Sequence, residues 1–81
     1  ASLTIIGNPP IISNLTIDTS YNTGIFIDTN SNITLDSVKI MCFSCVCISS
    51  NNESPVYLIG GIFTCNSFQV NNLIVKESQL K

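Results

Sequence analysis

Ile33-Thr-Leu-Asp-Ser-Val-Lys-Ile40 decides the fold, because two short runs of alternating apolar residues flank the small polar pair Asp36-Ser37. The same pattern occurs once earlier and once later in the chain, at a constant spacing. The three versions align as Ile12, Leu15 and Ile17, as Leu35, Val38 and Ile40, and as Leu58, Gly61 and Phe63. Repetition at a fixed period of this length is typical of a solenoid, in which successive coils stack and equivalent residues lie above one another.

A second series of apolar triplets runs between these stretches with nearly the same period. Its members are Leu3-Thr4-Ile5, Ile25-Phe26-Ile27, Val46-Cys47-Ile48 and Phe68-Gln69-Val70. Ile, Val, Thr and aromatic residues favour strands, and the two-residue turns of hairpins are missing between them. We predict an all-β fold, a single parallel β-solenoid (β-helix) segment over residues 1–81 with about 3.5 coils of 21–23 residues. Residues 75–81 are the one candidate for a helix.

Strand alternation then predicts the core. Apolar residues at alternate positions point inward, and equivalent residues of neighbouring coils lie about 4.8 Å apart. The expected inward columns are Leu3/Ile25/Val46/Phe68, Ile5/Ile27/Ile48/Val70, Ile12/Leu35/Leu58 and Ile17/Ile40/Phe63. A small polar bend column, as tight turns require, is expected at Asn14, Ser37 and Gly60.

Composition excludes several classes of function. Charged residues make up 10% of the chain and the only cations are Lys39, Lys76 and Lys81, so no basic surface for nucleic acid is expected. No apolar run approaches the length of a transmembrane helix, so no membrane span is expected. No signal segment opens the chain, which we take as mature or as an excised piece.

Several runs carry a resemblance to known proteins. Leu3-Thr-Ile-Ile-Gly-Asn8, Ser13-Asn-Leu-Thr-Ile17 and the run ending at Ile40 resemble right-handed parallel β-helices of the pectin-lyase-like type. Gly60-Gly61-Ile62, Phe63-Thr-Cys-Asn66 and Phe68-Gln-Val-Asn71 are similar to the Gly-Gly-Ala-aliphatic and Phe-x-x-Asn repeats of polymorphic outer-membrane adhesins. The Ala of that motif is missing here, and the Gly-Gly pair occurs once. The resemblance implies a β-helix fold and an adhesin role.

The four cysteines leave alternatives open. Cys42 and Cys65 are one coil period apart and therefore share a column, which puts their Cα atoms within disulfide range. The pair is either a disulfide, suited to an oxidising compartment, or a ladder of reduced buried thiols. Cys42-Phe-Ser-Cys45 has C-x-x-C spacing, but the βαβ context of a redox motif and the second pair of a zinc site are missing. Cys47, between two inward residues, should face outward.

No catalytic constellation emerges, and we expect a protein that is not an enzyme and binds no cofactor. Asp28 and Asp36 share a coil, yet calcium-assisted lyase chemistry would also need a base, and Lys39 is the only one nearby. Aspartates in turns are more often structural. An ice-binding surface would need an outward threonine ladder, and the outward columns Thr4/Phe26/Cys47/Gln69 and Ile11/Thr34/Tyr57 do not supply one.

The remaining polar features favour an extracellular or cell-surface protein. Sequons at Asn14 and Asn32 are candidate N-glycosylation sites, and a third, at Asn52, is weakened by Pro55. The outward face is rather apolar, which indicates contact with other protein surface. We therefore expect a structural module that associates with itself or with another protein. The most specific version of this expectation is end-to-end stacking of subunits into a filament. The expected assembly surface is Leu3, Phe26, Tyr57, Phe68 and Val70. The alternatives are an adhesin or glycan-binding segment, and a fragment of a polysaccharide-active enzyme.

Overall fold

The computed structural model describes residues 1–7, 11–18, 22–29 and 31–81. Within these residues the regular secondary structure is strand alone, and every strand pair is parallel. The strands are β1 (Leu3–Ile6), β2 (Ile11–Ser13), β3 (Thr16–Asp18), β4 (Thr23–Asp28), β5 (Ile33–Asp36), β6 (Lys39–Met41), β7 (Val46–Ser50), β8 (Val56–Ile59), β9 (Ile62–Thr64), β10 (Ser67–Gln69), β11 (Leu73–Lys76) and β12 (Gln79–Leu80). The predicted all-β parallel solenoid is confirmed.

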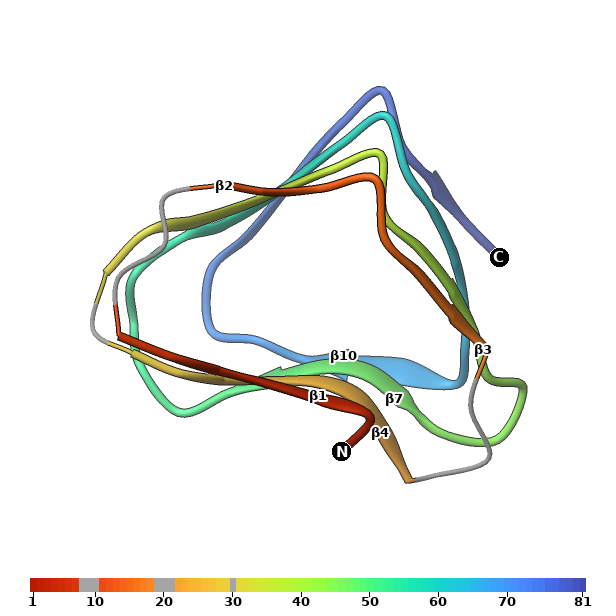
Figure 1. The fold of residues 1–81 in the computed structure, drawn as a ribbon, viewed down its shortest axis with the longest axis horizontal. Coiled ribbons are helices and arrows are strands. Elements are labelled where there is room, and N and C mark those ends of the chain that lie inside the picture. Colours follow the sequence, from red (N-terminus) through yellow and green to blue (C-terminus); the bar gives the residue numbers. More distant parts are fainter. Residues whose placement is uncertain (8–10, 19–21, 30) are drawn as a thin grey trace.

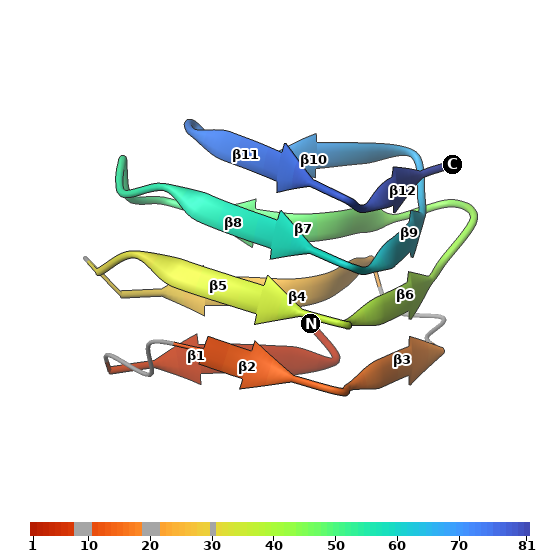
Figure 2. The same ribbon diagram turned by 90° about the horizontal axis from the view of Figure 1, so that it is seen from above.

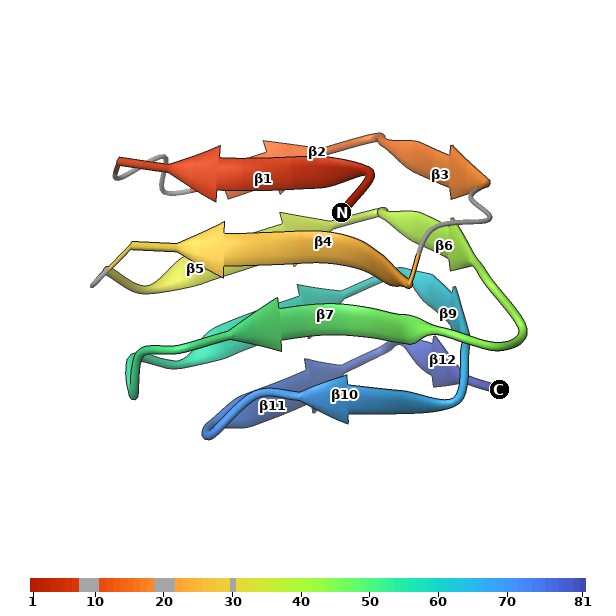
Figure 3. The same ribbon diagram turned by 90° about the horizontal axis from the view of Figure 1, so that it is seen from below.

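Three four-stranded sheets form the sides of a triangular coil (Figure 1). The first sheet has the order β1-β4-β7-β10, the second β2-β5-β8-β11 and the third β3-β6-β9-β12. Figures 2 and 3 show the coils stacked along the axis, with β1–β3 at one end and β10–β12 at the other. In Figure 1 the chain winds clockwise as it recedes from the viewer, so the solenoid is right-handed, like nearly all parallel crossovers.

The second and third sheets have the predicted register. Ile12 pairs with Leu35 and Leu35 with Leu58, while Ile17 pairs with Ile40 and Ile40 with Phe63. The structure adds a fourth rung to each column, since Leu58 pairs with Val75 and Phe63 with Leu80. The helix considered for residues 75–81 is therefore wrong, because these residues close the last coil as the end of β11 and as β12.

The predicted register of the first sheet is correct at one step and wrong at the next. Leu3 pairs with Ile25 as expected, but Ile25 pairs with Ile48 and Ile27 with Ser50, two positions later than predicted. The step from Ile25 to Ile48 equals the step from Leu35 to Leu58 in the second sheet, so the predicted step in the first sheet was two residues too short. The next step is shorter and irregular, with a register shift between Ser67 and Gln69.

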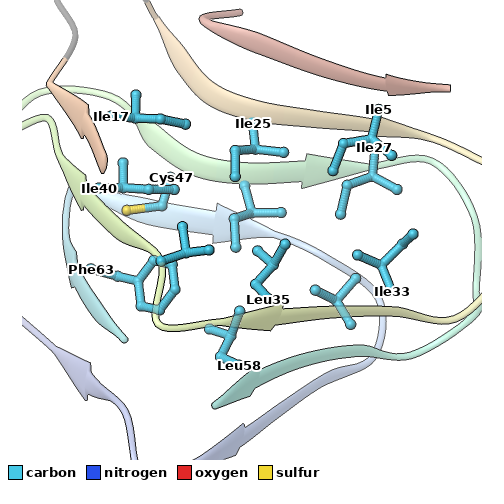
Figure 4. Close-up of a cluster of buried hydrophobic side chains, with 13 residues drawn as sticks. Ile5, Ile17, Ile25, Ile27, Ile33, Leu35, Ile40, Cys47, Leu58 and Phe63 are labelled. Atoms are coloured by element: carbon cyan, nitrogen blue, oxygen red, sulfur yellow. The ribbon is translucent and has the colours of Figure 1, made fainter. Parts of the chain in front are cut away.

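Burial divides the coils into two classes. The side chains with least exposure all come from the second and third coils: Ile25, Ile27, Ile33, Leu35, Val38, Ile40, Cys47, Ile48, Val56, Leu58 and Phe63. Figure 4 shows buried side chains of this core meeting inside the triangle. Full burial of an aliphatic side chain is worth about 1.5–3 kcal/mol, so the two inner coils contribute most of the hydrophobic stabilisation.

The predicted bend column lies at the corner between the second and third sheets. Asn14, Ser37 and Gly60 all have positive φ, at 56°, 58° and 63°, and Glu77 joins them at 54°. Small, polar or glycine residues tolerate this left-handed conformation best. The backbone ladder runs through the corner, because the N–H of Asn14 donates to Asp36 O (3.0 Å) and that of Ser37 donates to Ile59 O (2.8 Å).

Candidate functional site

The two ends of the solenoid are the surfaces where the core is incompletely covered. At the first coil, Leu3, Ile12 and Leu15 pack against the core but remain partly exposed, next to the buried Ile17. At the last coil, Phe68, Val70 and Leu73 likewise pack against the core and remain partly exposed. Val75 and Leu80 of the same coil are exposed. We call these sets the N-terminal end face (Leu3, Ile12, Leu15, Ile17) and the C-terminal end face (Phe68, Val70, Leu73, Val75, Leu80).

Exposure at the end faces follows from position in the column. In the second sheet, Leu35 and Leu58 are 0% exposed, whereas the next rung, Val75, is 41% exposed. In the third sheet, Phe63 is 0% exposed and the next rung, Leu80, is 48% exposed. At this end the residue type is the same at each rung, so the missing neighbour explains the exposure; at the other end the first rungs Ile5 and Ile17 remain buried.

The end strands also carry unpaired backbone. Among the described residues, β1, β2 and β3 pair on one side only, and so do β10, β11 and β12. Such edges are templates for pairing with another chain. The charges nearby differ in sign: Asp18 is exposed at the N-terminal end, and Lys76 and Lys81 are exposed at the C-terminal end, together with Glu77.

The predicted assembly residues do not form one surface. Leu3 belongs to the N-terminal end face, and Phe68 and Val70 belong to the C-terminal end face. Phe68 also makes an edge contact with Phe63, with ring centroids 6.0 Å apart. The other two, Phe26 and Tyr57, lie half-buried in β4 and β8 of different sheets.

Tyr57 is partly shielded by a neighbouring coil. The ammonium of Lys76 lies 6.0 Å from the centroid of its ring, within reach of a cation–π contact. The outer apolar face predicted from the sequence is therefore broken into separate half-buried side chains, and the two end faces are the better candidates for an interface.

The cysteines cluster at the corner between the third and first sheets, but the predicted Cys42–Cys65 disulfide is wrong. The bonds are Cys42–Cys45 and Cys47–Cys65, each with a Cα–Cα distance of 5.6 Å. The column itself is right, because Met41 pairs with Thr64 and places Cys42 beside Cys65. The turn after Cys42 brings Cys45 back to it, so Cys65 bonds instead to Cys47, the next cysteine along the chain in β7.

Cys47 is buried, and the prediction that it faces outward is also wrong. Cys47 and Ile48 are adjacent in β7 and both are fully buried, so simple alternation fails where the strand enters the corner. Its neighbour in the second coil is Gly24, whose added Cβ would lie 2.7 Å from Cys47 O and 3.0 Å from Ile40 Cγ2. A glycine in this place leaves room for the Cys47 carbonyl oxygen and for the Ile40 side chain.

Phe43 is an exposed aromatic residue that sequence reasoning passed over. It lies in the short loop closed by the Cys42–Cys45 disulfide, and 80% of its side chain is exposed. The signal that could have found it is the C-x-x-C spacing, since a disulfide across this spacing forces the two residues between outward. A single exposed aromatic on a cross-linked loop is compatible with a contact but does not define a partner.

A polar corner lies between the first and second sheets. The Asn52 side-chain amide donates to Thr29 O, and that of Asn71 donates to Asn52 O (3.0 Å), so one ladder links three coils. Asn52 Oδ1 also accepts the N–H of Ser54 (2.8 Å). Beside the ladder is a cavity of about 80 Å³ lined by Ile27, Asp28, Thr29, Asn51 and Asn52. Its donors and acceptors could bind a small polar group.

The sequons differ in accessibility. Asn14 and Asn32 are exposed, the former at the left-handed bend, whereas Asn52 is half-buried with its amide engaged in the polar ladder. Glycosylation at Asn14 and Asn32 stays a prediction. The acidic residues weighed for chemistry are separate: Asp28 ends β4, and Asp36 ends β5 and accepts a hydrogen bond from the Ser37 hydroxyl (3.1 Å).

Metal-binding clusters and membrane-spanning helices are both missing from the part of the chain that the structure describes. No three His, Cys, Asp or Glu side chains gather there in a group able to hold a metal ion. No helix there is long and apolar enough to cross a membrane. Comparison of the chain with family models, curated proteins and solved structures finds no match.

Proposed function

We propose that this chain is a non-enzymatic structural β-solenoid module of an extracellular or cell-surface protein that extends by contact between coil ends. The observation that carries the proposal is the contrast within the inward columns of the second and third sheets, where the inner rungs are fully buried and the last rungs, Val75 and Leu80, are 41% and 48% exposed. An added coil would cover the end rungs and pair the edge strands. Completing the burial of a half-exposed aliphatic side chain is worth about 1 kcal/mol, and three strands contribute such rungs together.

The proposed location rests on the cysteines. All four are joined in disulfides, which persist in oxidising compartments and are rare in reducing ones. The accessible sequons and the resemblance to pectin-lyase-like and adhesin β-helices agree with this location. The low charge and apolar ends agree with a role based on association.

Sedimentation of the purified chain over a concentration series tests the proposal. We expect the wild type to associate, and Leu80→Lys to weaken association because it places a charge on an end rung. Gln79→Lys is the matched control, since it adds the same charge at the exposed neighbouring position of β12. A wild type that stays monomeric at high concentration, unchanged by Leu80→Lys, contradicts end-to-end association. Electron microscopy of the associated fraction would show whether it is fibrous.

The cavity at the polar corner favours a second candidate, a glycan-binding module. Asp28 and Asn51 are exposed at its rim, and carboxylate and amide groups of this kind bind sugar hydroxyls. Titration of a panel of neutral oligosaccharides, followed by NMR shifts, tests this candidate. Shifts at the cavity that Asp28→Ala abolishes would support it, whereas shifts elsewhere or none would contradict it.

A further inference from the structure

The end strands of the third sheet carry opposite charges at equivalent positions. β3 ends at Asp18, and the sheet register puts Met41 and then Thr64 in the same column. One residue beyond the last pair of β12 with β9, this column reaches Lys81, whose backbone N–H donates to Phe63 O at 2.8 Å. Asp18 and Lys81 are therefore the first and fourth rungs of one outward column, and both are exposed.

The inward columns beside this one also match from end to end. Leu80 is the last rung of the column that begins at Ile17, and Val75 is the last rung of the column that begins at Ile12. Each pair joins two branched aliphatic residues at the ends of their columns, and all of these residues except the buried Ile17 are at least partly exposed. A first coil placed after the fourth would therefore continue both columns with residues of the kind already stacked within them.

A second outward column repeats the match. It begins at Ile11, passes through Thr34 and Tyr57, and ends at Ile74. Ile11 is exposed and Ile74 is half-buried. In a continued stack these two isoleucines would become neighbours and shield one another from water.

We propose that the C-terminal end face binds the N-terminal end face of a second copy of this chain, in the register that sets Lys81 beside Asp18. The proposal rests on the structural role proposed above and names its partner and its geometry. Adjacent rungs lie about 4.8 Å apart, which brings the ammonium and the carboxylate within reach of an ion pair. Because the two faces differ, the contact does not close on itself, and repetition produces an open filament.

The charges select this arrangement over its alternatives. Two C-terminal end faces meeting would gather Lys76, Glu77 and Lys81 of both molecules at one junction and would leave Asp18 without its lysine partner. A slip by two residues would place Lys81 beside Thr16 and forgo the ion pair. An exposed pair adds little affinity, but opposite charges fix orientation and register.

A charge-swap experiment on the full chain tests the register. The variants are Asp18→Lys, Lys81→Asp and the double variant, and the control is Glu53→Lys, which changes net charge as Asp18→Lys does at an exposed residue of the third coil. All variants share one C-terminus, so its charge is common to the comparison. Sedimentation at low salt measures association, and circular dichroism checks that each variant is folded.

We expect each single reversal to weaken association by about fivefold or more and the double variant to return within about twofold of wild type. An equimolar mixture of the two single variants should also associate, because the lysine introduced into one then meets the aspartate introduced into the other. If the wild type is monomeric throughout, the proposed structural role itself fails. If the wild type associates but the single reversals behave like Glu53→Lys, the role stands and this register is wrong.

Discussion

Truncation of one leucine at an inner rung and of another at an end rung, in neighbouring columns, should distinguish the fully buried core from the partly exposed end of the solenoid. Leu58→Ala removes three carbon atoms from a fully buried side chain, which costs about 2.4 kcal/mol at about 0.8 kcal/mol for each buried carbon. The cavity left between Leu35 and Val75 raises the expected loss to about 3–4 kcal/mol. For a domain of this size that corresponds to a fall in Tm of roughly 12–30 °C.

Leu80→Ala is the matched change at an end rung. Leu80 is about half exposed and no coil covers it among the described residues, so about half the transfer free energy is lost and no closed cavity forms. We expect a loss of about 1 kcal/mol and a fall in Tm of at most about 8 °C.

The assay is urea unfolding followed by circular dichroism, at a concentration where the wild type is monomeric, with the disulfides intact. The difference between the two variants is more informative than either value alone. Equal losses for Leu58→Ala and Leu80→Ala would refute the open end rung. A loss below about 1 kcal/mol for Leu58→Ala would refute the column register itself.

Three further predictions concern other parts of the fold. Replacing Cys47 and Cys65 together by serine should lower the free energy of unfolding by about 3 kcal/mol, since their bond spans 18 residues. In the wild type, non-reducing peptide mapping should recover Cys47 and Cys65 as one linked pair, and a link from either to another cysteine would contradict this pairing. Gly61→Ala should cost about 1–3 kcal/mol in thermal unfolding because the added methyl would lie 2.5 Å from a backbone oxygen of the neighbouring coil; an unchanged Tm would show that the coils can separate there. Asn52→Ala should lower the free energy of unfolding by about 2 kcal/mol, because two side-chain hydrogen bonds are lost. The control Asn51→Ala, at an exposed residue, should change it by less than about 0.5 kcal/mol, and equal effects would exclude a structural polar ladder.

The sequence predicts the first three rungs of the second and third sheets well because the step between those rungs is constant, whereas the shorter last step, to Val75 and Leu80, was missed. Ile12, Leu35 and Leu58 align by one repeated spacing, and the bend at Ser37 fixes the phase of the strands on both sides. The first sheet is harder, because its apolar residues offer two equivalent registers between β4 and β7. An alternating pattern is unchanged by a slip of two residues, so Val46 and Ile48 looked equally good partners for Ile25.

The sequence indicates that the ends of the solenoid are a candidate interface, but it does not identify every residue of the two end faces. Uncovered core at the ends follows from any solenoid of few coils, and Leu3, Phe68 and Val70 lie in the end coils. Phe26 and Tyr57 lie in the inner coils, in two separate outward columns of different sheets. The cysteine pairing depended on the path of one turn, and column spacing alone could not tell Cys45 from Cys65 as the partner of Cys42.

The Cys47–Cys65 bond has a mechanical consequence for the proposed filament. It spans 18 residues and joins the start of the third coil to its end, so that coil is a covalently closed ring. A pulling force applied to the two ends of the chain can unravel the other coils but cannot extend this one. At about 3.3–3.6 Å per extended residue, roughly 60 Å of contour length is withheld from stretching until the disulfide is reduced. Reducing conditions would therefore convert a stiff link into an extensible one without breaking the polypeptide.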